Sequence, residues 1–195
     1  MKTLPLIVVL ASFLGTSCAL TPLSVTLRPK VEVAATSLGQ GRTVGVTVLD
    51  ERPRSIVGYR GLAQGGGPFG ATITTAGDPS STVRAALADG LKRHGFNAVM
   101  GQIPEGRELR AEIRGLDYTI SQAIFASTLR AEFTLKGICV IGSTRPYEGT
   151  YRGEHQESLH IAQTDSAIEE DLNRVLSQAI QRLLQDAQLI QCLAR

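Results

Sequence analysis

The sequence lacks an excess of charge of either sign, and it has no second long hydrophobic run after its first 14 residues. Without a leader that contains Lys2, the basic residues fall from 20 to 19 against 18 acidic ones, which leaves a net charge of +1. This balance excludes a general electrostatic attraction to nucleic acid or anionic lipid. With 43% hydrophobic and 19% charged residues, the composition is that of one globular domain, which excludes a membrane bundle and a disordered chain.

Motifs that carry catalytic chemistry are also missing. No Gly-x-Ser-x-Gly turn surrounds a serine, and the glycine-rich segment 61–70 is not followed by the Lys-Ser or Lys-Thr of a phosphate-binding loop. His155 and His160 have two glutamates beside them, yet their odd separation on a strand would point the imidazoles to opposite faces. We therefore expect no catalytic residues, no metal site and no cofactor, and we interpret segment 61–70 as a mobile connection.

The one strongly hydrophobic run is at the N-terminus, where Met1-Lys2 precedes apolar residues from Leu4 to Leu14. The run is too short for the roughly 20 apolar residues that span a bilayer, so residues 1–17 are interpreted as a signal peptide. It ends at Leu14-Gly15-Thr16-Ser17-Cys18, which resembles the lipobox of bacterial lipoproteins, whose cysteine is acylated and becomes the new N-terminus. The alternative is an ordinary cleavage after Ala19.

An acylated Cys18 would determine where the protein resides. Several acyl chains hold a protein firmly on a membrane, because each buried methylene contributes about 0.8 kcal/mol. Ala19 then resembles an outer-membrane sorting signal, which implies a domain that faces the periplasm.

The other two cysteines, Cys139 and Cys192, would lie in an oxidising compartment. A disulfide between them would close a long loop and could stabilise the fold by about 4 kcal/mol. The alternative is two buried thiols that act as small hydrophobic side chains. The sequence leaves both possibilities open, because it does not give the distance between the two Cβ atoms.

The pattern after the leader predicts a lipid-anchored tether over residues 18–40 and a single α+β domain over residues 41–195. Prolines and glycines interrupt the tether, although segment 24–27 is compatible with an edge strand. Alternating apolar residues predict a core strand over 43–49 and three further strands near 109–120, 124–141 and 147–161.

Two helices are predicted from their end signals. Asp78-Pro79 begins the first helix, and Gly95 ends it. The second helix begins near Thr164 or Ser166, and its apolar residues recur at steps of three and four. Together these elements predict a two-layer α+β sandwich, with a mainly antiparallel sheet and two amphipathic helices on one face.

Asp50, Arg52 and Arg54 form the densest charged cluster at the end of a predicted core strand. Loops at such ends often bind partners, because the sheet holds them in place. The three residues are therefore predicted as a partner-binding site, and the alternative is a solvated turn with weak ion pairs.

Several of these features together resemble the YajG family of uncharacterised bacterial lipoproteins. They are the lipobox, the strand from Val44 to Asp50 with Arg52 behind it, the first helix ending in Arg93-His94-Gly95-Phe96, and the long last helix. The resemblance implies an envelope lipoprotein and offers no catalytic residues. It leaves the oligomeric state open.

Two classes of function follow from this resemblance. The first is a non-enzymatic outer-membrane lipoprotein whose periplasmic domain binds an envelope protein or polymer. The second is an accessory lipoprotein of a lipid or lipopolysaccharide transport system of the ABC type, which should expose a contiguous apolar groove.

Overall fold

The computed structural model describes residues 21–60, 71–122, 127–159 and 163–195. The predicted signal peptide, Cys18, His160 and the glycine-rich segment 61–70 lie outside the described residues. In the described part, none of the helices is both long and apolar enough to cross a membrane.

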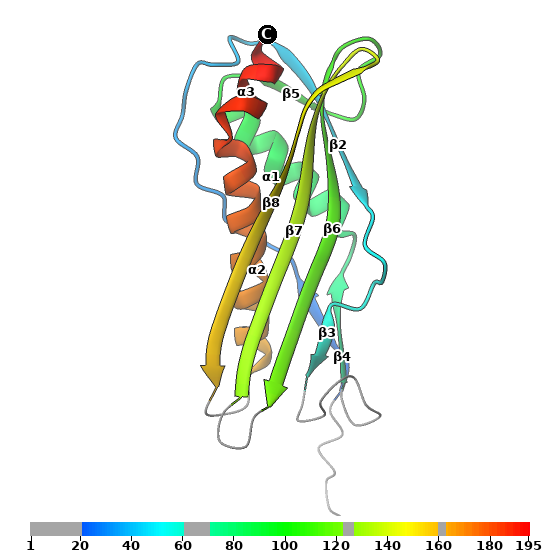
Figure 1. Cartoon of the computed structure of the whole chain (residues 1–195), viewed down its shortest axis with the longest axis vertical. Coiled ribbons are helices and arrows are strands. Elements are labelled where there is room, and N and C mark those ends of the chain that lie inside the picture. Colours follow the sequence, from blue (N-terminus) through cyan, green and yellow to red (C-terminus); the bar gives the residue numbers. More distant parts are fainter. Residues whose placement is uncertain (1–20, 61–70, 123–126, 160–162) are drawn as a thin grey trace, which may run out of the picture.

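Three long antiparallel strands form one half of the sheet (Figure 1). They are β6 (Arg107–Gln122), β7 (Ser127–Ile141) and β8 (Thr144–Leu159), with β7 in the middle and β8 at the edge. These strands agree with the three alternating runs predicted from the sequence. Pro146 lies in β8, because an edge strand tolerates a proline that cannot donate to the ladder.

Five shorter strands continue the described sheet beyond the other edge of β6. β2 (Thr43–Asp50) pairs with its first half and β3 (Gly58–Arg60) meets it at Tyr118. The remaining strands are β5 (Asn97–Met100) beside β2, β4 (Ala71–Ala76) beside β3, and β1 (Leu23–Thr26) beside β4.

The strand pairings refine the predicted fold class. The described residues form an α+β fold as expected, with a curled eight-stranded sheet and three helices. The sheet is antiparallel along its longest pairings, β6 with β7 and β7 with β8, and also between β3 and β4. The sequence did not predict the four shorter parallel pairings, which join β1 to β4, β2 to β5, β2 to β6 and β3 to β6.

A β-bulge in β6 keeps hydrophobic residues on one face along its whole length. The pairing with β7 shifts between Ile113 and Gly115. Before the shift the buried residues are Leu109 and Ile113, and after it they are Leu116 and Tyr118. The bulge thus moves the buried positions from odd to even numbers, since successive strand residues point to opposite faces. The opposite face carries charged residues in pairs such as Arg130 with Glu132.

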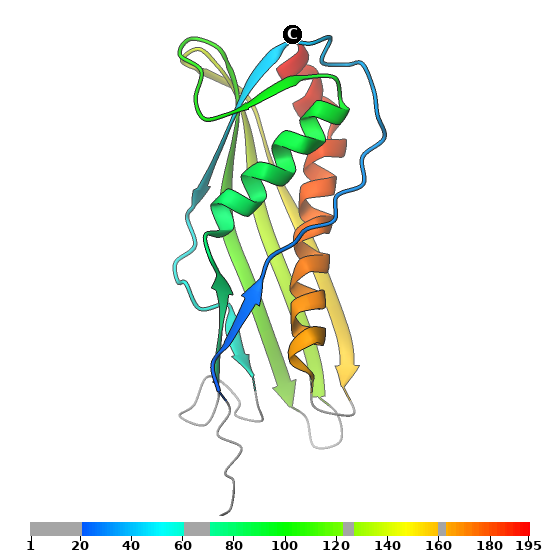
Figure 2. The same cartoon turned by 180° about the vertical axis from the view of Figure 1, so that it is seen from behind.

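The helices cover the buried face of the sheet (Figures 1 and 2). The first, α1 (Pro79–Arg93), begins as predicted, with the Asp78 carboxylate accepting from the backbone N–H groups of Ser80 and Ser81. Gly95 ends it with a φ of +83°. The second, α2 (Asp165–Gln185), is capped by Thr164. A third helix that the sequence pattern did not separate, α3 (Ala187–Ala194), follows a break at Asp186.

Residues 23–40 do not form the predicted tether. β1 is an edge strand of the sheet, and Val25, Leu27 and Val33 are buried in the core. The folded domain therefore begins near residue 23 instead of residue 41, and the possible strand at 24–27 is present.

The extended segment after β1 is bonded to α2 at a regular spacing. The backbone N–H groups of residues 26, 28 and 30 donate to the side chains of Glu169, Asn173 and Ser177. Two residues of extended chain rise about 6.6 Å and four residues of α-helix rise about 6.0 Å, so the two periods match. We call residues 26–30 the strap.

Gly153 of β8 allows the closest contact between α2 and the sheet. A Cβ at this position would overlap the backbone carbonyl oxygen of Val175. The absence of a side chain at Gly153 thus determines how near α2 can approach.

Replacing Gly153 with alanine should destabilise the domain by about 3 kcal/mol, because backbone atoms of α2 must move away from the sheet. Gly115→Ala is the matched control, since a Cβ there would have no neighbour nearer than 3.3 Å. Urea unfolding of both variants tests this expectation. Equal stabilities for the two variants would contradict it.

Candidate functional site

The predicted cluster at the end of β2 is paired internally. Asp50 accepts two hydrogen bonds from the guanidinium of Arg52, at 2.8 Å from Nε and 2.7 Å from Nη2. These bonds hold the pKa of the Asp50 carboxyl below its usual range. Arg54 turns instead to Asp117 of β6, at 2.7 Å.

The three predicted residues therefore differ in accessibility. The Arg52 side chain is only 5% exposed, and its Nη1 atom is buried without a hydrogen-bond partner. The Arg54 side chain is 54% exposed and Asp117 is 46% exposed. Only the Arg54–Asp117 pair is open to a partner, whereas Asp50 and Arg52 stabilise the turn that presents it.

A second polar cluster lies beneath the first turns of α2. Strand pairing places Tyr118, Ala131 and His155 in one row across β6, β7 and β8. Asp171 of α2 lies above this row, with its Oδ1 atom 3.3 Å from Nε2 of His155 and 3.7 Å from Nη1 of Arg174. The cluster links α2 to the edge strand.

Burial raises the pKa of two residues in this cluster, Tyr118 and Asp171. Tyr118 is fully buried, and its hydroxyl has no hydrogen-bond partner. Burial raises the pKa of Tyr118, and the nearby carboxylates of Asp171 and Glu157 add to the effect. Burial also raises the pKa of Asp171, although His155 and Arg174 oppose the shift. The geometry supports a structural link, and the described residues contain no group of three or more potential ligands that could hold a metal ion.

A third cluster centres on Asp186, where the chain breaks between α2 and α3. One oxygen of its carboxylate accepts from the hydroxyls of Tyr147 and Tyr151, at 2.6 and 2.7 Å. The other accepts from the backbone N–H groups of Gln188 and Leu189 and so caps α3. Burial opposes ionisation of this carboxyl, but the four donors outweigh it and lower the pKa of Asp186.

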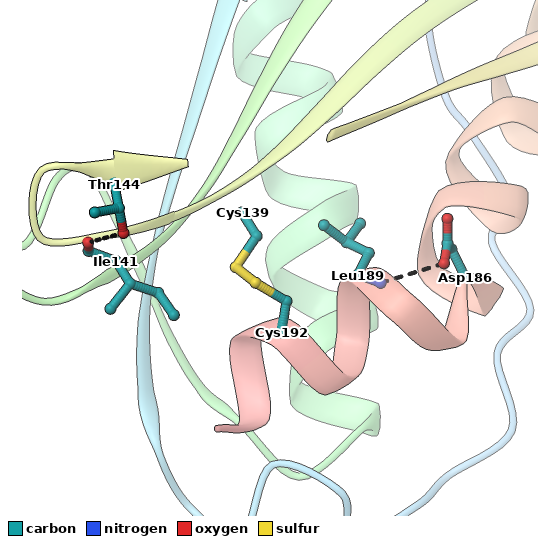
Figure 3. Close-up of a disulfide and its surroundings, with 6 residues drawn as sticks. All are labelled: Cys139, Ile141, Thr144, Asp186, Leu189 and Cys192. Atoms are coloured by element: carbon teal, nitrogen blue, oxygen red, sulfur yellow. Dashed lines mark hydrogen bonds between the residues drawn. A yellow bond between two sulfur atoms is a disulfide. The ribbon is translucent and has the colours of Figure 1, made fainter. Parts of the chain in front are cut away.

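The disulfide between Cys139 and Cys192 lies close to this cluster (Figure 3). It joins the end of β7 to α3 across 53 residues, and both cysteines are buried. The sequence left a bridge and two free thiols open, and the structure contains the bridge. Asp186 and the disulfide together fix both ends of α3 against the sheet.

The sequence analysis did not identify the Asp186 cluster as a site. Tyr147 and Tyr151 have the even spacing that places two side chains on one face of a strand, and this was a usable signal. Asp186 gave none, because an isolated aspartate in an apolar helix pattern does not indicate which strand residues lie above it.

The fold is similar to that of solved bacterial proteins. The crystal structure of protein XCC0632 from Xanthomonas campestris has a TM-score of 0.56 at 13% identity, over 84% of this chain and 92% of that chain. A minor lipoprotein from Acinetobacter baumannii has a TM-score of 0.45 at 11% identity, over 74% of this chain and 90% of that chain. The first likeness shows a shared fold.

A family model described as an uncharacterised lipoprotein matches residues 29–194, so the chain belongs to this family. The resemblance to the YajG family is thereby confirmed. The comparison with curated proteins found no match. Neither the family description nor the similar structures indicate a catalytic function.

Reduction of the disulfide should destabilise the domain by about 4 kcal/mol, because the unfolded chain regains the freedom of a long loop. Urea unfolding with and without a reductant measures this difference. The double variant Cys139→Ala, Cys192→Ala is the control and should not respond to the reductant. An unchanged midpoint in the wild-type protein would contradict the stabilising role.

Asp186→Asn should cost about 2 kcal/mol at pH 7, because two tyrosine hydroxyls lose their charged acceptor, whereas an asparagine can still cap α3. Since the folded protein lowers the pKa of Asp186, its contribution is present above the ordinary value of 3.8 and is lost as the pH falls through the folded pKa. The difference from wild type should therefore narrow below about pH 4. Asp89→Asn, which changes an exposed carboxylate, should lie within about 0.5 kcal/mol of wild type at both pH values.

Proposed function

We propose that the protein is a non-enzymatic lipoprotein of the outer membrane, acylated at Cys18, whose domain faces the periplasm and binds an envelope partner. Its membership of a lipoprotein family supports the anchor, and the lipobox supports Cys18 as its position. Ala19 supports the outer membrane as its location.

One observation carries this proposal: the sheet begins at Leu23, only five residues after Cys18. Five residues reach at most about 18 Å, so the domain would stand directly on the membrane surface. A tether that ended at residue 40 would have let the domain move several times farther from the membrane surface. The short link therefore favours a domain of fixed orientation over one that searches freely.

The strand directions determine which end would face the bilayer. The start of β1 lies at the same end of the molecule as the ends of β6 and β8 and the start of α2 (Figures 1 and 2). The C-terminus, α3 and the turn between β7 and β8 lie at the opposite end. β6 and β8 have 16 residues each, so the two ends are roughly 50 Å apart.

The strap would transmit this orientation from the anchor to the domain. Its three backbone bonds to α2 fix the chain that leaves the membrane against the longest helix. The exposed pair of Arg54 and Asp117 then lies on the side of the upright domain, where we propose that a partner binds and that Asp50 and Arg52 support the turn.

The transport alternative receives no support from the described surface. Its large exposed hydrophobic residues are Leu38 in a loop, Leu49 in β2 and Met100 in β5, and these come from three separate elements. We therefore develop the adaptor proposal alone.

Labelling with radioactive palmitate tests the anchor in growing cells. The wild-type protein should incorporate the label and should sediment with the outer membrane, whereas Cys18→Ser should incorporate none. Asp89→Asn, which changes an exposed residue and should leave the fold intact, is the control and should be labelled like wild type. Equal labelling of Cys18→Ser would contradict the proposal, as would sedimentation of the labelled protein with the inner membrane.

A further inference from the structure

A polar cleft opens at the end of the molecule that lies opposite the start of β1. Its volume is about 310 Å³. Pro146 and Tyr147 of β8 form one wall, and four residues at the C-terminal end of the chain form the other: Gln188, Gln191, Cys192 and Arg195. The cleft is as large as a small ligand site, which typically begins near 300 Å³.

The walls of the cleft are held in place by the interactions already described. The hydroxyl of Tyr147 is bonded to Asp186, which fixes the ring. The disulfide at Cys192 ties the wall formed by α3 to β7. The Tyr147 ring and the end of α3 are therefore held in place before a ligand binds, so that only the exposed side chains of Gln188, Gln191 and Arg195 would have to be ordered.

The chemistry of the lining is specific. Gln188 and Gln191 are exposed, and each amide can both donate and accept hydrogen bonds. Pro146 and the ring of Tyr147 supply an apolar surface on which a sugar ring can pack. Arg195 supplies a guanidinium, which suits a carboxylate.

Arg195 is the cation among the six lining residues, none of which has an acidic side chain, and the exposed Arg145 is next to Pro146 in the chain. Two acidic residues lie nearby: Glu148 is engaged by Lys136 at 2.8 Å, and Asp186 accepts from the hydroxyl of Tyr147. Because both carboxylates have partners, the guanidinium of Arg195 is the group that a small anionic ligand would meet in the cleft.

We propose that this cleft binds a carboxylate-bearing, N-acetylated glycan of the cell envelope. The amides would bond the acetamido and hydroxyl groups, the Tyr147 ring and Pro146 would pack on the sugar ring, and Arg195 would pair with the carboxylate. This inference rests on the proposed function, because an upright domain holds the cleft roughly 50 Å from the anchoring membrane, where a periplasmic polymer can reach it.

The test uses the mature lipoprotein in detergent micelles and measures binding by calorimetry. The probes are N-acetylmuramic acid, N-acetylglucosamine as the neutral sugar, an acidic peptide, and glycerol phosphate as a lipid headgroup without acyl chains. The acidic sugar should bind more tightly than the neutral one, and the peptide and the glycerol phosphate should bind weakly or not at all.

Arg195→Gln should weaken binding of the acidic sugar about tenfold and leave the neutral sugar unchanged. Gln191→Ala should weaken both sugars about three- to tenfold. Arg93→Gln is the matched control, because it removes one exposed cation outside the cleft and should change neither affinity.

Three results would overturn the proposal: no binding of the acidic sugar, equal losses for Arg93→Gln and Arg195→Gln, or stronger binding of the peptide or glycerol phosphate. The anchor is tested separately by palmitate labelling. A protein that incorporates palmitate but binds no sugar would support the anchor and reject the cleft. A protein that binds the sugar but incorporates no palmitate would reject the anchor alone.

Discussion

The close packing of α2 on β7 and β8 is the constraint on which the rest of the structure depends. Buried side chains of α2 meet a strip of the sheet where Gly137 and Gly153 provide room for them. Because α2 lies so near the sheet, the strap can reach it from one side, and Gln178 can accept from the backbone N–H of Glu154 on the edge strand. The helix thus covers the core and protects part of an edge that would otherwise be open to other strands.

Local signals in the sequence predicted most of the elements, because they act within a few residues. Asp78 caps α1 as expected, Gly95 ends it, and the alternating runs became β6, β7 and β8. Such signals do not determine which strands become neighbours. The parallel pairing of β2 with β5 and β6 depends on contacts between distant residues, and so the sequence did not predict it.

The same limit explains the error at the N-terminus. Residues 23–40 contain scattered apolar positions without a sustained period, and their pairing with β4 and their backbone bonds to side chains of α2 depend on distant parts of the chain. A partner-binding role of Asp50, Arg52 and Arg54 stays a prediction, and the sequence did not reveal how the three residues are paired. Asp117, which is distant in the sequence, forms an ion pair with Arg54. The side chain of Arg52 is buried and is paired with Asp50 within the turn.

The two ends of the domain differ in structure, and α2 connects them. At one end the strap and β1 receive the chain from the proposed anchor, and at the other end Asp186 stops the helix and redirects the chain into α3. An uninterrupted helix would have carried the final residues past the sheet and away from β8. The break at Asp186 instead returns them to the edge strand, where the disulfide holds them and the cleft forms between the two elements. Asp186 therefore belongs to both features: it caps the helix that follows the longest one, and it bonds the tyrosine that lines the proposed cleft.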